Sequence, residues 1–215
     1  MNTHTPRAYN SKLRAHQAEA TRSRIIASAE ILFVERGYEN ATIAAIAAGA
    51  RVAPQTVYAA FGSKVGLVSA ILDRIRCDER YQAMHQKAMQ TSDPCQSLHA
   101  VAHLICEIYD SRAPLFEQLL GTLAISQELA RHLEVQHLHD RKVSRIYLTS
   151  LFERGCLREE LDIERALDIF WVLINFAPYQ MLVRHCRWSS QAYVDWLTNL
   201  LCRELLRQPP QDTMR

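Results

Sequence analysis

The sequence predicts an all-α protein: an N-terminal three-helix unit of the helix-turn-helix type, then a C-terminal helical bundle, about nine helices in all, paired as a homodimer. Only 6 glycines and 7 prolines interrupt 215 residues, which favours long helices over a strand-rich fold. Apolar residues make up 48% of the chain, enough for a substantial core. Their spacing is helical, and no strand alternation stands out.

The first 66 residues are expected to hold a tail and three short helices. Residues 1–20 are polar and lack an apolar period, which predicts a mobile N-terminal tail. Thr21 and Thr42 are the expected N-caps of the first two helices, and Gly37 is placed to end the first. The third helix runs from Pro54 to about Phe61. A tight break at 49–52 makes residues 21–66 a helix-turn-helix unit.

Residues 67–207 predict longer helices that form a second domain, and residues 208–215 a C-terminal tail. By apolar spacing, caps and breaks, the expected helices lie at about 64–89, 95–111, 114 onward, 127–154, 163–185 and 190–206. The helix at 163–185 is apolar all round and therefore needs cover on every side. A second copy of the chain is the simplest cover, and the alternative is a central helix of a monomeric bundle.

Charge and cysteine content narrow the class of protein. Residues 1–66 hold eight Lys/Arg and four Glu, a net +4, whereas the whole chain is only +2, so the remainder is −2. A basic front end indicates an anionic partner, with nucleic acid the obvious one. The chain has no leading apolar segment and no uninterrupted membrane span, so we expect a soluble, cytoplasmic protein with no membrane partner. Its six cysteines form no C-x-x-C pair and are expected as buried thiols.

The stretch "RVAPQTVYAAFGSK" (residues 51–64) has the chemistry of a DNA-reading helix. Val57 and Phe61 share one face and are expected to point inward, while small residues on the other face allow close approach to a surface. Gln55 can pair with an adenine edge, and the phenol of Tyr58 can reach a phosphate. Lys64 opens the next helix, where its charge and the helix N-terminus both attract phosphate.

The stretch from Ala41, "ATIAAIAAGARVAPQTVYAAFGSKVGLVSAIL", with the preceding "IIASAEILFVERGY", resembles the DNA-binding domain of the TetR family of transcriptional regulators. The resemblance covers about Thr21 to Leu72. The matching positions are Phe33, Gly37, Tyr38, Thr42, Ile46, Ala47, Thr56, Tyr58, Phe61 and Lys64. The segments "RGCLREELDIERALDIFWVL" and "WSSQAYVDWL" are similar to the ligand-binding and dimerisation half of some members.

The resemblance implies a ligand-responsive regulator, most simply a repressor that a small-molecule effector releases from a palindromic double-stranded DNA operator. It implies phosphate contacts at Thr42 and Tyr58 and an anchoring role for Lys64. The groove-facing positions are Pro54, Gln55, Thr56 and Ala60. Two departures stand out: Arg51 replaces a glycine, so it is expected to take φ > 0 and to reach a phosphate, and Ala53 replaces a serine cap.

The effector pocket and the dimer interface are less specified by the sequence. Candidate pocket residues are His103, Phe116, Tyr147, Trp171 and Asn175. Asn175 stands in an apolar helix and needs a hydrogen-bond partner, which a ligand or the dimer mate would supply. Candidate interface residues are Trp171, Ile174, Tyr179, Trp196 and Leu200.

An alternative function is a helical metal- or redox-sensing protein, centred on a flank formed by Cys95, His99, His103 and Cys106. His99 and His103 have the i, i+4 spacing that can chelate a metal, although such residues also line bundle boundaries. The sequence shows no nucleophile elbow, phosphate loop or paired catalytic carboxylates, so we expect no enzyme, no cofactor and no metal.

Overall fold

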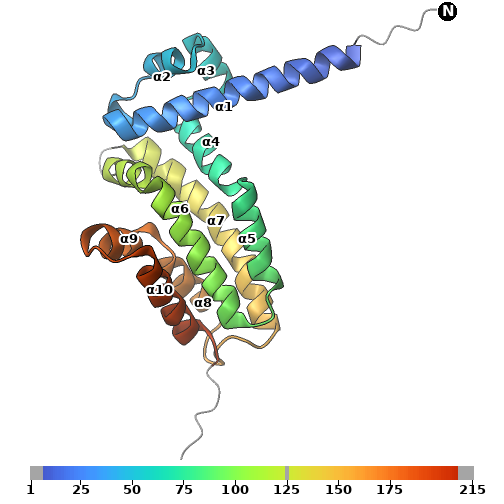
Figure 1. Cartoon of the computed structure of the whole chain (residues 1–215), viewed down its shortest axis with the longest axis vertical. Helices are drawn as coiled ribbons and strands as arrows, with labels where there is room; N and C mark the ends of the chain where they lie inside the picture. The colour runs from blue at the N-terminus through green and yellow to red at the C-terminus, as the bar shows by residue number, and fades with distance from the viewer. Residues whose placement is uncertain (1–6, 124–125, 208–215) are drawn as a thin grey trace, which may run out of the picture. The chain divides into compact units, whose positions relative to one another are not determined.

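The computed structural model describes residues 7–123 and 126–207, and the regular elements among them are all helical, which confirms the predicted fold class (Figure 1). The helices are α1 (Arg7–Asn40), α2 (Ile43–Ala50), α3 (Pro54–Phe61), α4 (Lys64–Arg76), α5 (Glu79–Gln90), α6 (Pro94–Thr122), α7 (Gln127–Glu153), α8 (Ile163–Leu173), α9 (Phe176–Tyr179), a π-helix η1 (Gln180–His185) and α10 (Ser190–Leu205).

The chain packs as two compact units. The N-terminal unit comprises Met1–Arg74 together with Glu117–Ala130, and the C-terminal unit comprises Ile75–Phe116 together with Arg131–Arg215. The end of α6 and the start of α7 therefore belong with the N-terminal unit, which sequence reasoning did not predict. The predicted tail at 208–215 lies outside the described residues.

The N-terminal tail predicted at 1–20 is wrong for residues 7–20, which form the first turns of α1. Residues 1–6 lie outside the described residues. Residues 7–20 hold four alanines, two arginines and one each of Lys, Leu, Gln and Glu, and extending an existing helix through such residues is favourable even without apolar spacing. Thr21 therefore starts no helix. Gly37 does interrupt α1 as predicted, with φ 78° and ψ 157°.

Two of the later helix boundaries differ from the prediction. The helix expected at 64–89 is divided, because the Asp78 carboxylate accepts a hydrogen bond from Arg80 N at 2.9 Å and caps α5. In contrast, Pro114 does not open a new helix as predicted but lies inside α6. Proline removes only one backbone hydrogen bond there, while its neighbours Ala113 and Leu115 are fully buried.

The apolar segment predicted as one helix at 163–185 is broken at Ile174–Asn175 into α8, α9 and η1. The side-chain oxygen of Asn175 accepts from Ala177 N at 3.2 Å and caps α9. By length and composition Ile163–His185 is apolar enough to cross a membrane, with mean hydropathy 1.4, but core helices of soluble proteins pass the same test.

The C-terminal unit is built around one apolar core. Leu98 of α6, Leu148 of α7, Leu167 of α8 and Leu197 of α10 are all fully buried in it. The end of α10 is tied to the α7–α8 connection by an antiparallel bridge between Leu157 and Leu206. Helix α7 ends before Gly155 (φ 66°), as predicted.

Candidate nucleic-acid interface

Helix α2 is held at its start and along its length by specific hydrogen bonds. Thr42 is its N-cap, as predicted, and its Oγ1 accepts from Ala45 N at 3.1 Å. Ser28 of α1 donates its hydroxyl to Ile46 O at 2.9 Å, which fixes α2 against α1. Ile46 and Ala50 are buried in the same contact. These bonds set the position of the turn that follows.

The turn between α2 and α3 has the left-handed backbone that the sequence predicted. Arg51 adopts φ 56° and ψ 49°. Its N–H bonds Ala48 O at 3.1 Å, and Val52 N bonds Ala47 O at 3.0 Å, so the last carbonyls of α2 are satisfied. The side chain of Arg51 is exposed, whereas its backbone conformation is fixed by the hydrogen bonds of the turn.

Helix α3 spans Pro54–Phe61, as predicted, and presents a bare outer face. Ala53 is its N-cap residue without a side-chain hydrogen bond, and Pro54 starts the helix. Val57 is 1% exposed and holds the helix from behind, while Tyr58 is 54% exposed. The other exposed side chains of this helix are Pro54, Gln55, Thr56, Ala59 and Ala60. Bulky core residues are absent from the outer face, so backbone and short side chains can approach a partner closely.

Sequence reasoning missed two contacts that fix the end of α3. The Arg22 guanidinium donates to Ala60 O at 3.1 Å and lies 4.4 Å from the centroid of the Phe61 ring. At Gly66 of α4 an added Cβ would lie 2.0 Å from Phe61 O, so only glycine permits this close approach. Nothing in the local sequence identifies Arg22 as a partner of residues 38 positions away.

Lys64 is occupied within the protein. Its Nζ donates to Tyr38 O at 2.7 Å and to Glu39 O at 3.1 Å, and lies 4.3 Å from the centroid of the Tyr38 ring. The ammonium therefore joins the start of α4 to the end of α1, which fits the anchoring role that the resemblance implied. Burial, with a smaller contribution from Glu128 and Glu39, raises the pKa of Tyr38 to about 12.

Known proteins match the chain over this same region. The sequence profile described as "Bacterial regulatory proteins, tetR family" matches residues 25–71, which contain α2, the turn and α3. Over these residues the chain carries a DNA-binding domain of the tetR-family type. It is 27% identical over 205 residues to the transcriptional repressor NicS of Pseudomonas putida, covering 86% of this chain and 91% of that protein. It is 28% identical over 168 residues to the regulator TtgR, also of P. putida, covering 74% and 79%.

Solved structures share the fold. The structure of NalD, the secondary repressor of the MexAB-OprM multidrug efflux pump in Pseudomonas aeruginosa, superposes with a TM-score of 0.68 at 21% identity, covering 90% of this chain and all (100%) of that one. A TetR-family regulator from Rhodococcus sp. superposes with a TM-score of 0.69 at 15% identity, covering 84% and 96%. At these identities the likeness shows the fold alone.

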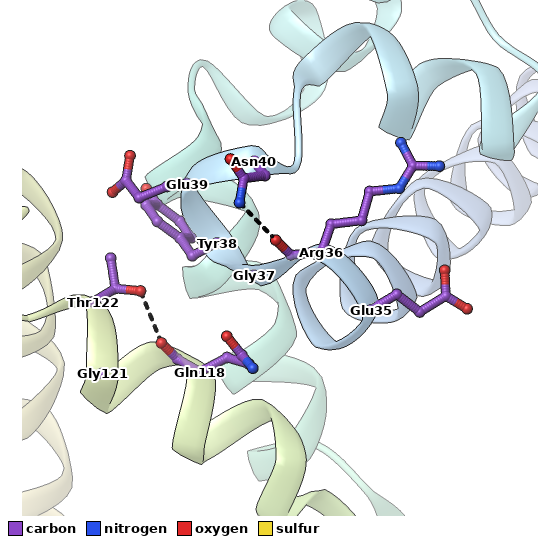
Figure 2. A pocket seen from close by; sticks show the side chains of 9 residues that line it. All are labelled: Glu35, Arg36, Gly37, Tyr38, Glu39, Asn40, Gln118, Gly121 and Thr122. Carbon is purple, nitrogen blue, oxygen red and sulfur yellow. Dashed lines mark hydrogen bonds between the residues drawn. The ribbon is translucent and has the colours of Figure 1, made fainter.

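A polar hollow of about 490 Å³ lies in the N-terminal unit, between the ends of α1 and α6 (Figure 2). Its lining residues are Glu35, Arg36, Gly37, Tyr38, Glu39, Asn40, Gln118, Gly121 and Thr122. Asn40 donates to Arg36 O at 3.0 Å and Thr122 to Gln118 O at 2.8 Å, so these groups are satisfied internally. None of the predicted pocket residues lines this hollow.

The five predicted pocket residues have separate local contacts. Tyr147 is buried and bonds the Ser97 hydroxyl at 2.8 Å, and burial raises its pKa to about 12. Phe116 stacks on Phe176, Trp171 meets the ring of His137 edge-on, and His103 is exposed beside Glu107. The side-chain oxygen of Asn175 accepts from Ala177 N, so one hydrogen-bond partner of this side chain comes from the chain itself.

The predicted interface residues divide by exposure. Ile174 and Tyr179 are buried within their own subunit, and Tyr179 donates its hydroxyl to Asp110 Oδ1 at 2.5 Å, which corrects their assignment to a subunit surface. Trp171, Trp196 and Leu200 are partly exposed. The sequence did not single out the strongly exposed apolar residues of the same region, Val172 and Met181.

The cysteine prediction is also corrected. Cys95 and Cys202 form a disulfide between α6 and α10, with Cα atoms 5.7 Å apart, and Cys77 and Cys186 are exposed. Only Cys106 is a fully buried thiol among the described residues, with a pKa that burial and the nearby Asp110 raise to about 12.

The Cys/His flank offers no metal centre. His99 bonds the Thr198 hydroxyl at 3.2 Å, Cys95 is in the disulfide, and within residues 7–123 and 126–207 no group of three or more metal-ligating side chains converges. The structure and the relatives therefore give no support to the metal- or redox-sensing alternative.

Proposed function

We propose that this TetR-family helix-turn-helix regulator is a cytoplasmic, homodimeric repressor that binds a palindromic operator and is released by a small-molecule effector. The exposed outer face of α3 carries this proposal. It is bare, is held from behind by Val57, and follows a turn fixed by Arg51. The relative NicS is named a repressor, which supports repression over activation.

Each exposed residue of this face suits a distinct contact with DNA. The Gln55 amide matches the N6 and N7 edge of adenine, and Pro54, Thr56 and Ala60 allow close approach to the major groove. The Tyr58 phenol and the exposed Arg51 guanidinium suit phosphate oxygens. The Thr42 hydroxyl accepts from Ala45 N as a cap, so its own hydrogen is available for a phosphate. Lys64 acts through the α1–α4 anchor.

Release by an effector follows from linkage. Such an effector binds more tightly to a state in which the spacing of the two recognition helices does not match the operator, and it thereby lowers the affinity for DNA. By reciprocity, bound DNA lowers the affinity for the effector by the same factor. Two half-sites one helical turn apart require two copies of α3, which a homodimer provides.

The test begins with selection of bound duplexes from a random DNA pool. Tyr58→Phe should then weaken binding to all duplexes by about fivefold through loss of one hydrogen bond. Gln55→Ala should relax preference at one base pair by about 1–3 kcal/mol. Gln96→Ala, at an exposed glutamine of α6, is the matched control. Unchanged affinity and unchanged preference in Gln55→Ala would rule out base reading by this residue.

A further inference from the structure

Helix α3 has little apolar anchorage of its own. It is eight residues long, and among these residues, all of which the structure describes, only Val57 is buried. A helix of about two turns is marginal in isolation, so its direction depends on what holds it from outside. One buried side chain near the middle of a helix fixes a point but not a direction. The contacts at the two ends of α3 therefore set the direction in which it lies.

The two ends of α3 are held differently. At its N-terminal end the helix follows directly on the α2–α3 turn, which backbone hydrogen bonds to the end of α2 fix. At its C-terminal end, Tyr58 O accepts from Gly62 N at 2.8 Å, within the local chain. Ala60 O instead accepts from Arg22 of α1, whose Nη1 lies 3.1 Å away and 38 positions earlier in the sequence. The last turn of α3 is thus tied to a different helix.

The Arg22 guanidinium makes two contacts at this end. It donates to Ala60 O, and its central carbon lies 4.4 Å from the centroid of the Phe61 ring. The first contact brings a cation to the carbonyl end of the helix dipole, and the second places a planar cation over an aromatic face. Because the two contacts fall on consecutive residues, they fix both the position of the last turn and its rotation about the helix axis.

We propose that Arg22 is a positioning residue for operator recognition, which sets the direction of α3 and thereby the base pairs that its outer face reads. The proposal rests on the proposed function, because it needs α3 in a DNA groove. A tilt about Val57 would move Gln55 at one end and Ala60 at the other relative to the base edges. Hydrogen bonds to bases depend steeply on distance and angle, whereas charge-based attraction to phosphates does not depend on sequence. Loss of Arg22 should therefore weaken specific binding more than non-specific binding.

The experiment measures the affinity of the wild type and of Arg22→Ala for two duplexes of equal length. One is the tightest binder recovered from a random pool, and the other is a scrambled version of it. Arg24→Ala removes the same charge from an exposed arginine of the same helix, which bonds Thr21 of α1, and is the matched control. Arg22→Lys keeps the charge, and Phe61→Leu removes the ring but keeps an apolar side chain. Circular dichroism and thermal melting check folding, and if Arg22→Ala does not fold, the last two variants carry the comparison.

We expect Arg22→Ala to bind the selected duplex about tenfold more weakly than the wild type, and the scrambled duplex within about twofold of it. Arg22→Lys should bind the selected duplex about threefold more weakly, because an ammonium cannot reproduce the planar contact. Arg22→Ala/Phe61→Leu should lose less than the product of the two single losses, since both changes remove the same contact. The slope of log affinity against log salt should stay within about 0.3 of the wild type. Arg24→Ala should leave the ratio of the two affinities unchanged.

Three results would decide against this role. Equal losses on the two duplexes would overturn it, and a salt slope smaller by about 1 would then assign Arg22 a phosphate contact instead. Unchanged affinity of a folded Arg22→Ala for both duplexes would also overturn it, while operator recognition by α3 stands. If the wild type selects no sequence from the pool, the proposed function fails and the positioning role fails with it.

Discussion

Each of the two units is stabilised internally by a different kind of contact. In the N-terminal unit, single polar side chains reach backbone carbonyls far away in sequence: Lys64 to Tyr38 and Glu39, and Arg22 to Ala60. In the C-terminal unit, aromatic rings pack on one another, and the centroids of neighbouring rings lie 5.0–5.8 Å apart. The ring residues of this cluster are Tyr109, Phe116, Phe176, Tyr179, Tyr193 and Trp196.

This difference follows from what each unit has to present. The N-terminal unit must keep an outer face almost free of core residues, so a few directional bonds position α3 where apolar area is scarce. The C-terminal unit fills a volume, and non-directional apolar burial is sufficient for that. We therefore expect the loss of a polar side chain to lower stability mainly in the N-terminal unit. Loss of the disulfide or of apolar packing should lower it mainly in the C-terminal unit.

The largest effect should come from the disulfide, which is present only in the C-terminal unit among the described residues. Cys95 and Cys202 are separated by 107 residues, so reduction should lower the free energy of unfolding by about 3–5 kcal/mol. Denaturant unfolding with and without a thiol reductant measures it, and Cys95→Ser should be insensitive to the reductant. A wild type that unfolds identically in both conditions would remove this covalent contribution from the comparison.

Lys64→Met should have the next largest effect, through the N-terminal unit. It keeps the length of the side chain but removes two hydrogen bonds from a charged donor, at a cost of about 2 kcal/mol in unfolding free energy. Operator affinity should fall for all sequences, because the anchor of α4 to α1 is lost. Lys142→Met is the exposed control. Weaker DNA binding at unchanged stability would instead assign Lys64 a direct phosphate contact.

Tyr147→Phe should cost about 1 kcal/mol at pH 7, because the buried hydroxyl bonds Ser97. The folded pKa of about 12 lies above the ordinary value of 10.0, so the folded state keeps a proton that the unfolded state releases. This tyrosine's contribution is therefore complete below pH 10 and is lost as pH rises from 10 to about 12, by about 1.4 kcal/mol per pH unit.

Unfolding curves at pH 7, 10 and 11 measure the difference between the two proteins. The variant should lose less stability than the wild type over this alkaline range. Parallel losses in the two proteins would show that Tyr147 does not titrate in this way.

Substitutions at Arg51 should have the smallest effect. A left-handed backbone costs a non-glycine residue about 1 kcal/mol, but glycine raises the entropy of the unfolded chain by a similar amount, so Arg51→Gly should change stability by less than about 0.5 kcal/mol. Arg51→Val, with a branched Cβ, should destabilise by about 1–2 kcal/mol. Thermal melts compare the two, and equal melting temperatures would contradict a conformational role.

Sequence reasoning succeeded where the chemistry is local. The Thr42 cap, the positive φ of Arg51 and the bounds of α3 each depend on a residue and its close neighbours. It failed where distant residues decide. The partners of Lys64 lie 25 and 26 positions away, and Pro114 stays helical because its neighbours are buried in the fold. Residues 7–20 had no apolar period, yet helix propagation from the packed part of α1 orders them.

The allocation of α6 has a consequence for building chimeric regulators. The helix is continuous from Pro94 to Thr122, yet its last turns, with the start of α7, belong to the N-terminal unit, where Leu119 and Leu129 are buried. A fusion that grafts only residues 1–74 onto another sensor omits this second piece. Apolar side chains of residues 1–74 that this piece covers would then be exposed. A working graft therefore needs the stretch from Glu117 to Ala130 as well.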